Sequence, residues 1–281
     1  MRNFLLVLVI LSFTTKSFAQ STVDSTKGVV NLIGTYLLTF RIDSTSQDAS
    51  TEKMQLLLSN NFSVFESVNK IIQDSTTESM ASSNTLGGDN GNMGLSITRM
   101  LKTMGTKFSY KIYKMYHPNK CIIYDNIIRD NYKYEETSYP LIWQITSTTA
   151  SIAGFKCSKA TTSFAGRHYE AWFTREIPIS DGPYKFSGLP GLIIKVNDTT
   201  NSYVFELLSL VKPAKVYIVK FPPGKVSTTT KATFFKASKE MREHAVDLAP
   251  QYNVTIKNPD AVRAHLAERM KHANNPVELK Y

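Results

Sequence analysis

Residues with the chemistry to hold a ligand gather in the middle of the chain. Arg167, Trp172 and Glu176 lie close together, and Tyr184 follows them. An arginine and a carboxylate can orient a ligand while an aromatic ring packs on it, so these four side chains predict a ligand-binding groove. In a regular strand Arg167 and Trp172 point to opposite faces. A structural interpretation stays open beside this one, with an Arg–Glu pair holding a loop and the tryptophan in the core.

Other reactive side chains form no catalytic or metal signature. His168 and Glu170 share one face of a predicted strand, but a zinc site needs three or four converging ligands. No serine lies in a Gly-x-Ser-x-Gly pattern. The adjacent carboxylates Glu135 and Glu136 point to opposite faces, so they cannot flank one glycosidic bond. We predict no catalytic residue, no metal and no cofactor, and the alternative is a hydrolase with a site around residues 167–181.

The chain has two cysteines, Cys121 and Cys157. An oxidising compartment would allow them to pair, and closing a loop of that length adds about 3–4 kcal/mol in the chain-entropy model. Neither lies in a Cys-x-x-Cys pattern, so thiol redox catalysis has no support. The sequence is compatible both with a disulfide and with two free thiols.

The N-terminus predicts export. Arg2 precedes an apolar run over residues 4–11, and Ser17 and Ala19 are the small residues expected before a signal-peptidase cut. The run is shorter than the roughly 20 residues that a membrane-spanning helix needs. We expect residues 1–19 to be a signal peptide and the mature chain to begin at Gln20. The protein would then be periplasmic or associated with the outer membrane, without a transmembrane segment.

The chain is basic, and its positive charge is unevenly distributed. The formal net charge is +10, and residues 212–281 hold 13 Lys and Arg against 6 Asp and Glu. Such a region can meet phosphate-rich lipid or polysaccharide at an envelope surface. The same lysines can also be solvated helix faces. Nucleic acid is not an expected partner, because the chain is exported and carries no nucleic-acid-binding motif.

Runs of alternating and β-branched residues predict a mainly β protein. Residues 54–58 and 62–68 flank an Asn-rich turn and predict a hairpin. From residue 108 onward strands follow one another with no long helix between them, which favours an antiparallel sheet. The segment 73–93 has almost no large apolar side chain and predicts a mobile loop. Further strands are predicted at residues 29–42, 109–116, 121–128, 132–136, 141–145, 152–162, 168–174, 192–196 and 203–210.

Helical periodicity replaces the strand pattern near the C-terminus. Residues 230–248 carry an apolar stripe at helical spacing, and Asn258 and Pro259 form the start of a second helix over residues 259–273. We therefore predict an α+β fold. It consists of a curved antiparallel sheet, resembling a half-barrel, with both helices packed on it, in a single domain over residues 20–281.

A short motif, centred on Pro190, predicts a tight turn. Proline presets φ at the second position of a type II turn, and Gly191 supplies the positive φ at the third, whereas Gly188 needs none. The segment 176–191 is rich in proline and glycine, so it is stiff and is predicted to border a concave surface. The motif consists of Gly188, Leu189, Pro190, Gly191, Leu192 and Ile193.

This hexamer and its surroundings resemble the GLPGLI family of exported Bacteroidetes proteins. The resemblance is densest over residues 131–210 and implies an exported, β-rich protein. The family has no established activity, so the resemblance implies no catalytic residue. The matching context comprises residues 156–162, 166–167, 171–174, 176–179 and 182–186, and residues 275–279 resemble the family's usual ending.

Three functions are compatible with these patterns. The first is a non-enzymatic binding or carrier protein of the cell envelope, whose concave sheet face holds an apolar or extended ligand such as a peptide, lipid or glycan. The second is the hydrolase named above. The third is a structural or interaction module that meets an outer-membrane protein partner through its basic C-terminal region.

Overall fold

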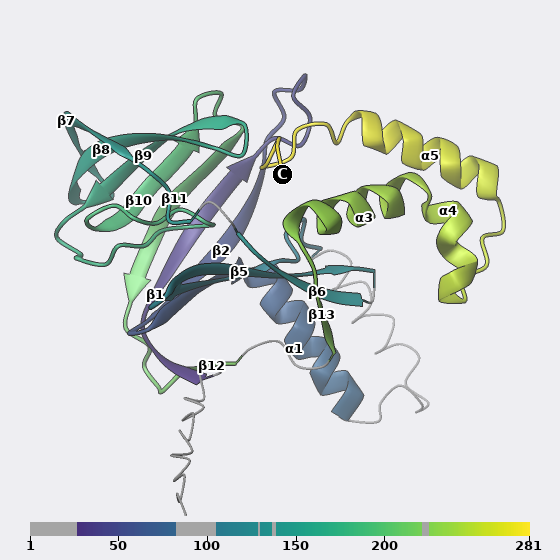
Figure 1. Ribbon diagram of the computed structural model, residues 1–281, viewed down its shortest axis with the longest axis horizontal. Coiled ribbons are helices and arrows are strands. Elements are labelled where there is room, and N and C mark those ends of the chain that lie inside the picture. Colours follow the sequence, from purple (N-terminus) through teal and green to yellow (C-terminus); the bar gives the residue numbers. More distant parts are fainter. Residues whose placement is uncertain (1–26, 83–104, 129, 137–138, 221–224) are drawn as a thin grey trace, which may run out of the picture.

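The computed structural model describes residues 27–82, 105–128, 130–136, 139–220 and 225–281. Within these ranges thirteen strands form one curved, open sheet (Figure 1). The strand order is β13-β6-β5-β4-β3-β2-β1-β11-β10-β9-β8-β7, and β12 pairs with β1. The strands are β1 (Lys27–Phe40), β2 (Ser50–Ser59), β3 (Phe62–Ser67), β4 (Lys111–Tyr116), β5 (Asn119–Ile127), β6 (Asp130–Glu135), β7 (Gln144–Ile152), β8 (Phe155–Phe164), β9 (Arg167–Thr174), β10 (Leu192–Asp198), β11 (Tyr203–Val211), β12 (Ile218–Lys220) and β13 (Val226–Thr228).

The sheet is antiparallel, as the strand-rich sequence predicts. The one parallel pairing among the described strands joins β13 to β6 at one edge. Strand β1 is central, with β2 on one side and β11 on the other. Its alternating residues Tyr36, Leu38 and Phe40 are buried on one face. The predicted hairpin around the Asn-rich turn is confirmed by the pairing of β2 with β3.

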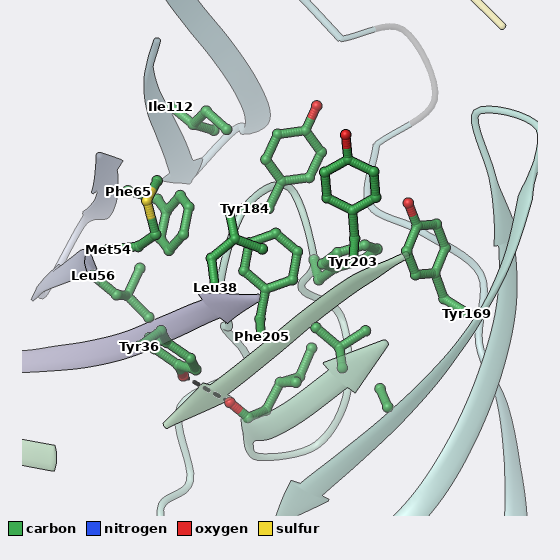
Figure 2. Packing of buried hydrophobic residues seen from close by; sticks show 14 of the residues in the cluster. Tyr36, Leu38, Met54, Leu56, Phe65, Ile112, Tyr169, Tyr184, Tyr203 and Phe205 are labelled. Carbon is green, nitrogen blue, oxygen red and sulfur yellow. Dashed lines mark hydrogen bonds between the residues drawn. The ribbon is translucent and has the colours of Figure 1, made fainter. Parts of the chain in front are cut away.

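The inner face of the curve carries the main core. Side chains from both halves of the sheet meet there, including Phe65 of β3 and Phe173 of β9, and both are fully buried. Tyr184 and Phe186, which lie between β9 and β10, fill the same space, and Tyr184 stacks on Phe205 (Figure 2). The concave face that the sequence predicts as a ligand surface is therefore packed by the protein's own aromatic side chains.

The two cysteines lie far apart in the strand order. Cys121 is on β5 and Cys157 is on β8, and both are buried free thiols. The disulfide that the sequence allows is therefore not formed, because the fold places the two residues in opposite halves of the sheet. Burial raises the pKa of the Cys121 thiol to about 12, so this side chain behaves as a small apolar core residue.

The first part of the predicted mobile loop is a helix. Helix α1 (Val68–Ser82) follows β3 directly and contacts β2 and β3. Lys70 pairs with Asp74 one turn later, and the Thr76 hydroxyl donates to the Ile72 carbonyl at 2.7 Å. The polar composition of this segment does not predict a helix, which is stabilised by these local pairs and by contact with β2 and β3. Residues 83–93 of the predicted loop lie outside the described residues.

Helix α3 (Lys231–Glu243) packs on the sheet as predicted. Thr230 caps it, since its side chain accepts a hydrogen bond from the Thr233 amide at 3.2 Å. Phe234 is buried against Tyr134 of β6, with ring centroids 5.4 Å apart. The predicted helix over residues 230–248 breaks at His244 and continues as α4 (Ala245–Leu248) and the short turn η2 (Ala249–Tyr252).

Helix α5 (Pro259–Lys271) does not pack on the sheet, and this part of the prediction is wrong. Asn258 caps it as expected, but none of its residues is buried, and its neighbour is α4 (Figure 1). The predicted stripe of Val262, Leu266 and Met270 is only half-buried. One apolar residue per turn makes too narrow a face to be buried against a sheet.

A smaller apolar cluster lies on the outer face of the sheet. It contains Val30, Leu57, Val64 and Tyr113, and Val219 of β12 covers it. The outer face is thus apolar near β1 to β4. Among the described residues, no helix combines the length and apolarity that crossing a membrane requires.

Candidate binding groove

The segment 175–191, here called the β9–β10 connection, is bound tightly to the sheet. Its backbone pairs with the start of β10, since the Leu192 amide donates to Ile177 at 3.0 Å and the Ile193 amide donates to Asp181 at 2.9 Å. The Tyr36 hydroxyl donates to the Ile193 carbonyl at 2.7 Å from across the core (Figure 2). The connection is therefore a rigid part of the core, as its proline and glycine content predicts.

A buried ion pair fixes the middle of this connection. The ammonium group of Lys114 on β4 contacts the carboxylate of Asp181, and both side chains are fully buried. The same ammonium donates to the Gly182 carbonyl, and the Tyr116 hydroxyl donates to Asp181 at 2.8 Å. Burial and the neighbouring carboxylate raise the pKa of Tyr116, so this hydroxyl stays a donor. A charge buried in this way is retained because it has several partners.

The turn of the motif differs from the predicted type. The Gly191 amide donates to the Leu189 carbonyl at 2.8 Å, which is a three-residue turn around Pro190 rather than a type II turn. Both Gly188 and Gly191 have positive φ, at 96° and 151°, so the expectation that Gly188 needs none is wrong. A Cβ on Gly191 would lie 2.0 Å from the Thr174 carbonyl oxygen. Close approach of two backbones therefore requires glycine at this position.

A second buried cluster joins the connection to the C-terminal segment. Lys185 lies 2.7 Å from Glu136 and 2.6 Å from Glu278, and Lys231 of α3 lies 2.7 Å from Glu278. Burial alone would lower the pKa of Lys185, but the two carboxylates outweigh it and raise that pKa. Burial likewise opposes ionisation of Glu278, and its two lysine partners nevertheless hold its pKa below the ordinary value. Lys185 and Glu278 are therefore held in their charged forms by their mutual ion pair.

Arg167 pairs with groups of the protein itself, and its predicted partner is wrong. It is buried and pairs with Asp198 at 3.0 Å, not with Glu176. Its guanidinium also donates to the Asn275 side chain at 2.5 Å and to the carbonyls of Pro276 and Val277 at 2.6 and 3.2 Å. Arg167 thus ties the C-terminal segment to β9, and every one of these partners belongs to the protein itself.

The other three predicted ligand-binding residues do not converge. Glu176 is exposed and accepts the Lys156 amide at 2.8 Å. Trp172 is half-buried, with Lys159 over its ring at 5.9 Å. Tyr184 is buried in the core, where its hydroxyl donates to Glu278. The fold separates these side chains because strand alternation sends Trp172 away from the face that Arg167 and Tyr184 occupy.

A groove of about 460 Å³ opens where the β2–β3 and β4–β5 turns meet the β9–β10 connection. The segment 176–191 borders this groove, as predicted. Arg167, Trp172 and Glu176 do not line it. The lining residues are Asn31, Leu32, Leu58, Ser59, Asn60, Tyr116, His117, Asn119, Tyr139, Pro140, Pro178, Ile179, Ser180, Ser187 and Gly188.

The groove is polar but uncharged. None of its described lining residues is Asp, Glu, Lys or Arg, although the chain carries a net charge of +10. Asn31 and Asn60 are joined by a hydrogen bond of 2.6 Å across the rim. The exposed side chains of His117 and Asn119 have no hydrogen-bond partner among the described residues and can bind a ligand. Amides, hydroxyls and aromatic rings here suit a neutral polar molecule.

Sequence reasoning missed the turn residues that form this groove. The sequence predicts Asn60, His117 and Asn119 only as turn residues. The signal that could have found them is topological. In a meander of β2, β3, β4 and β5, alternate turns lie at the same end of the sheet, so the β2–β3 and β4–β5 turns must be neighbours.

A smaller depression of about 270 Å³ lies over β8 and β9. Ser163 and His168 face each other there across the strand pair, with the serine oxygen 2.8 Å from Nδ1. Glu170, the predicted strand-face partner of His168, pairs instead with Lys159 at 2.8 Å. Among the described residues, no group of three His, Cys, Asp or Glu side chains could hold a metal.

The central region of the chain matches the profile of a known protein family. A profile of the family described as "Protein of unknown function (Porph_ging)" matches residues 165–195, which span β9, the β9–β10 connection and the first residues of β10. This range contains the Gly188 to Ile193 hexamer. No curated protein sequence matches the chain.

Solved structures similar to this chain include two of PNGF-II. The structure in the P21 space group has a TM-score of 0.50 and 14% identity, covering 76% of this chain and 34% of that one. The structure in the C2 space group has a TM-score of 0.49 and 14% identity, covering 74% and 33%. At such identity the likeness concerns the fold alone. This chain spans about a third of the PNGF-II chain.

Proposed function

We propose that this chain is an exported cell-envelope protein of the GLPGLI type that binds a neutral glycan in the groove and catalyses no reaction on it. The observation that carries the proposal is the absence of any charged side chain among the described lining residues of the groove. A phosphorylated or strongly acidic ligand would need cationic partners, and the groove offers amides and hydroxyls instead.

The available groups match the chemistry of a sugar chain. Glycan hydroxyls both donate and accept hydrogen bonds, and so do the amides of Asn60 and Asn119. Tyr116 and Tyr139 supply apolar ring surface against which the C–H face of a sugar can pack. A lipid chain would leave these amides without partners at a cost of roughly 1–3 kcal/mol for each group, which disfavours an apolar ligand.

A glycan array, followed by calorimetric titration of the neutral glycans that bind, tests this function. The variants Asn119→Ala and His117→Ala should weaken binding roughly five- to tenfold each, the value of one lost hydrogen bond. Both side chains are exposed, so the melting temperature should not change. Asn131→Ala, an exposed asparagine on β6 outside the groove, is the matched control. Selection of acidic glycans only, or unchanged affinity in both groove variants, would refute the proposal.

Export is supported by the apolar run over residues 4–11 and the small residues before Gln20. The hexamer and its context support the GLPGLI assignment. The match to a family of unknown function covers the same central region.

A hydrolase is the second candidate, favoured by the pair of Ser163 and His168. A serine within hydrogen-bond reach of a histidine is the minimal arrangement for nucleophilic catalysis. The pair ranks second because no described carboxylate orients the histidine. Labelling of Ser163 by a fluorophosphonate probe, abolished by His168→Ala, would favour this candidate over the binding function.

A further inference from the structure

A buried ion pair lies next to two of the segments that line the groove. Lys114 and Tyr116 are alternate residues of β4, and Tyr116 lines the groove whereas Lys114 is fully buried. Asp181, which is also fully buried, follows Ser180, a lining residue of the β9–β10 connection. The contact between Lys114 and Asp181 therefore joins the part of the groove formed by β4 to the part formed by the connection.

The Asp181 carboxylate contacts both of these segments. Its Oδ2 accepts the Tyr116 hydroxyl at 2.8 Å, and its Oδ1 accepts the Gly182 amide at 2.6 Å and contacts the Lys114 ammonium group. The Asp181 amide donates to the carbonyl of Ile179 at 2.8 Å, which ties this lining residue to the carboxylate. A network in which each polar group has a partner holds its members in one arrangement.

A buried ion pair of this kind contributes more to geometry than to stability. Taking two charges out of water costs about as much as their attraction returns, and neutral residues of similar volume often replace such a pair without loss of stability. Neutral side chains do not supply the same directional contacts. The role that fits Lys114 and Asp181 is therefore positional.

We propose that Lys114 and Asp181 are positioning residues, which hold Tyr116 and the lining residues Ile179 and Ser180 in the arrangement that binds a ligand. The inference rests on the proposed function for the identity of that ligand, a neutral glycan. A preformed groove binds more tightly, because fewer side chains must be ordered when the ligand arrives. Loss of the pair should therefore weaken binding roughly tenfold while the fold persists.

Two variants separate positioning from stability. Lys114→Met combined with Asp181→Asn, here called the charge-free variant, leaves no buried charge alone and keeps an acceptor for the Tyr116 hydroxyl, but it removes the contacts of the ammonium group. Tyr116→Phe removes only the hydroxyl contact. The matched control is Lys111→Met combined with Glu66→Gln, since this pair joins β4 to β3 at 2.9 Å and neither residue lines the groove.

Amide hydrogen exchange of the unliganded protein tests the geometry without a ligand. The amides of Ile179 and Ile193 donate within the connection and to its Asp181 carbonyl. In the charge-free variant both should exchange roughly tenfold faster, because the connection opens locally. Tyr116→Phe should accelerate the same amides to a smaller extent. The melting temperature and the exchange of Phe173, in the core on β9, should match the wild type in every variant.

Titration with the neutral glycans that the array selects completes the test. The charge-free variant should bind roughly tenfold more weakly, and the control variant should bind as the wild type does. Unchanged exchange at both amides, unchanged affinity, or unfolding of the charge-free variant would overturn the inference. If the wild type binds no neutral glycan, the proposed function fails, and the exchange rates alone still decide whether the pair positions the groove.

Discussion

Replacement of Arg167 by alanine should destabilise the protein without touching the groove. The guanidinium has three kinds of partner, namely the Asp198 carboxylate, the Asn275 side chain and two carbonyls of the C-terminal segment. Removing one partner of a buried ion pair leaves an uncompensated buried charge, at a cost of about 3–5 kcal/mol.

The lower end of this range is expected. Asp198 is 2% exposed, but it keeps hydrogen bonds from the Tyr203 amide at 2.8 Å and the Thr200 hydroxyl at 2.5 Å after the arginine is lost. These two hydrogen bonds still stabilise the negative charge of the Asp198 carboxylate in part. A loss of about 3 kcal/mol corresponds to a fall in Tm of roughly 6–12 °C for a domain of this size.

Urea unfolding at neutral pH measures the effect. Lys195→Ala is the matched control, because Lys195 pairs with Glu206 at 2.6 Å in a partly exposed setting where such pairs contribute about 1 kcal/mol or less. The double variant Arg167→Ala and Asp198→Asn should recover part of the loss, since no buried charge is then left alone. If Arg167→Ala unfolds within 1 kcal/mol of the wild type while glycan binding disappears, the structural role is refuted.

Three further predictions concern the glycines of the Gly188–Ile193 motif, the buried charges and the cellular location. Gly191→Ala should lower the unfolding free energy well beyond Gly188→Ala, because an added Cβ at Gly191 would meet a backbone oxygen at 2.0 Å and at Gly188 only at 3.3 Å; equal melting temperatures would contradict this. The pKa of Glu278 lies below its ordinary value of 4.5 in the folded protein, so its stabilisation is present above that pH and is lost as the pH falls below it. Glu278→Gln should flatten the fall of stability in acid, and an unchanged pH profile would show that Lys185 does not depend on it. Mass spectrometry of the envelope fraction should find Gln20 as the first residue, and a retained signal segment would contradict export.

Much of the fold could be predicted because strand pattern and turn chemistry are local. The alternation in β4 and the Asn-rich turn between β2 and β3 can be recognised from the local sequence, without knowledge of the neighbouring strands. Helix α1 was missed because its polar composition carries little apolar periodicity. Its stability comes from short-range pairs such as Lys70 with Asp74, and from contact with strands that are adjacent only once the sheet exists.

The candidate site was predicted only in part. The border supplied by the β9–β10 connection followed from its proline and glycine content. Arg167 does not line the groove, and its partners, Asp198 and Asn275, are 31 and 108 residues away in sequence. Nothing in the local sequence indicates that these polar groups form hydrogen bonds with one another. An arginine that binds a ligand cannot be distinguished, from sequence, from one that binds the C-terminal segment of its own chain.

The β-rich class and the hairpins follow from the amino-acid sequence alone, because each depends on φ, ψ and side-chain alternation over a few residues. The folded chain sets where charge is buried, which thiols stay free and which turns meet, and the close approach of the Thr174 backbone makes glycine necessary at position 191. Tyr184 and Phe186 pack into the concave face, so the candidate groove lies at the turns at the end of the sheet and not on that face. These features depend on contacts between segments that are distant in sequence, and a local sequence pattern carries no information about such contacts.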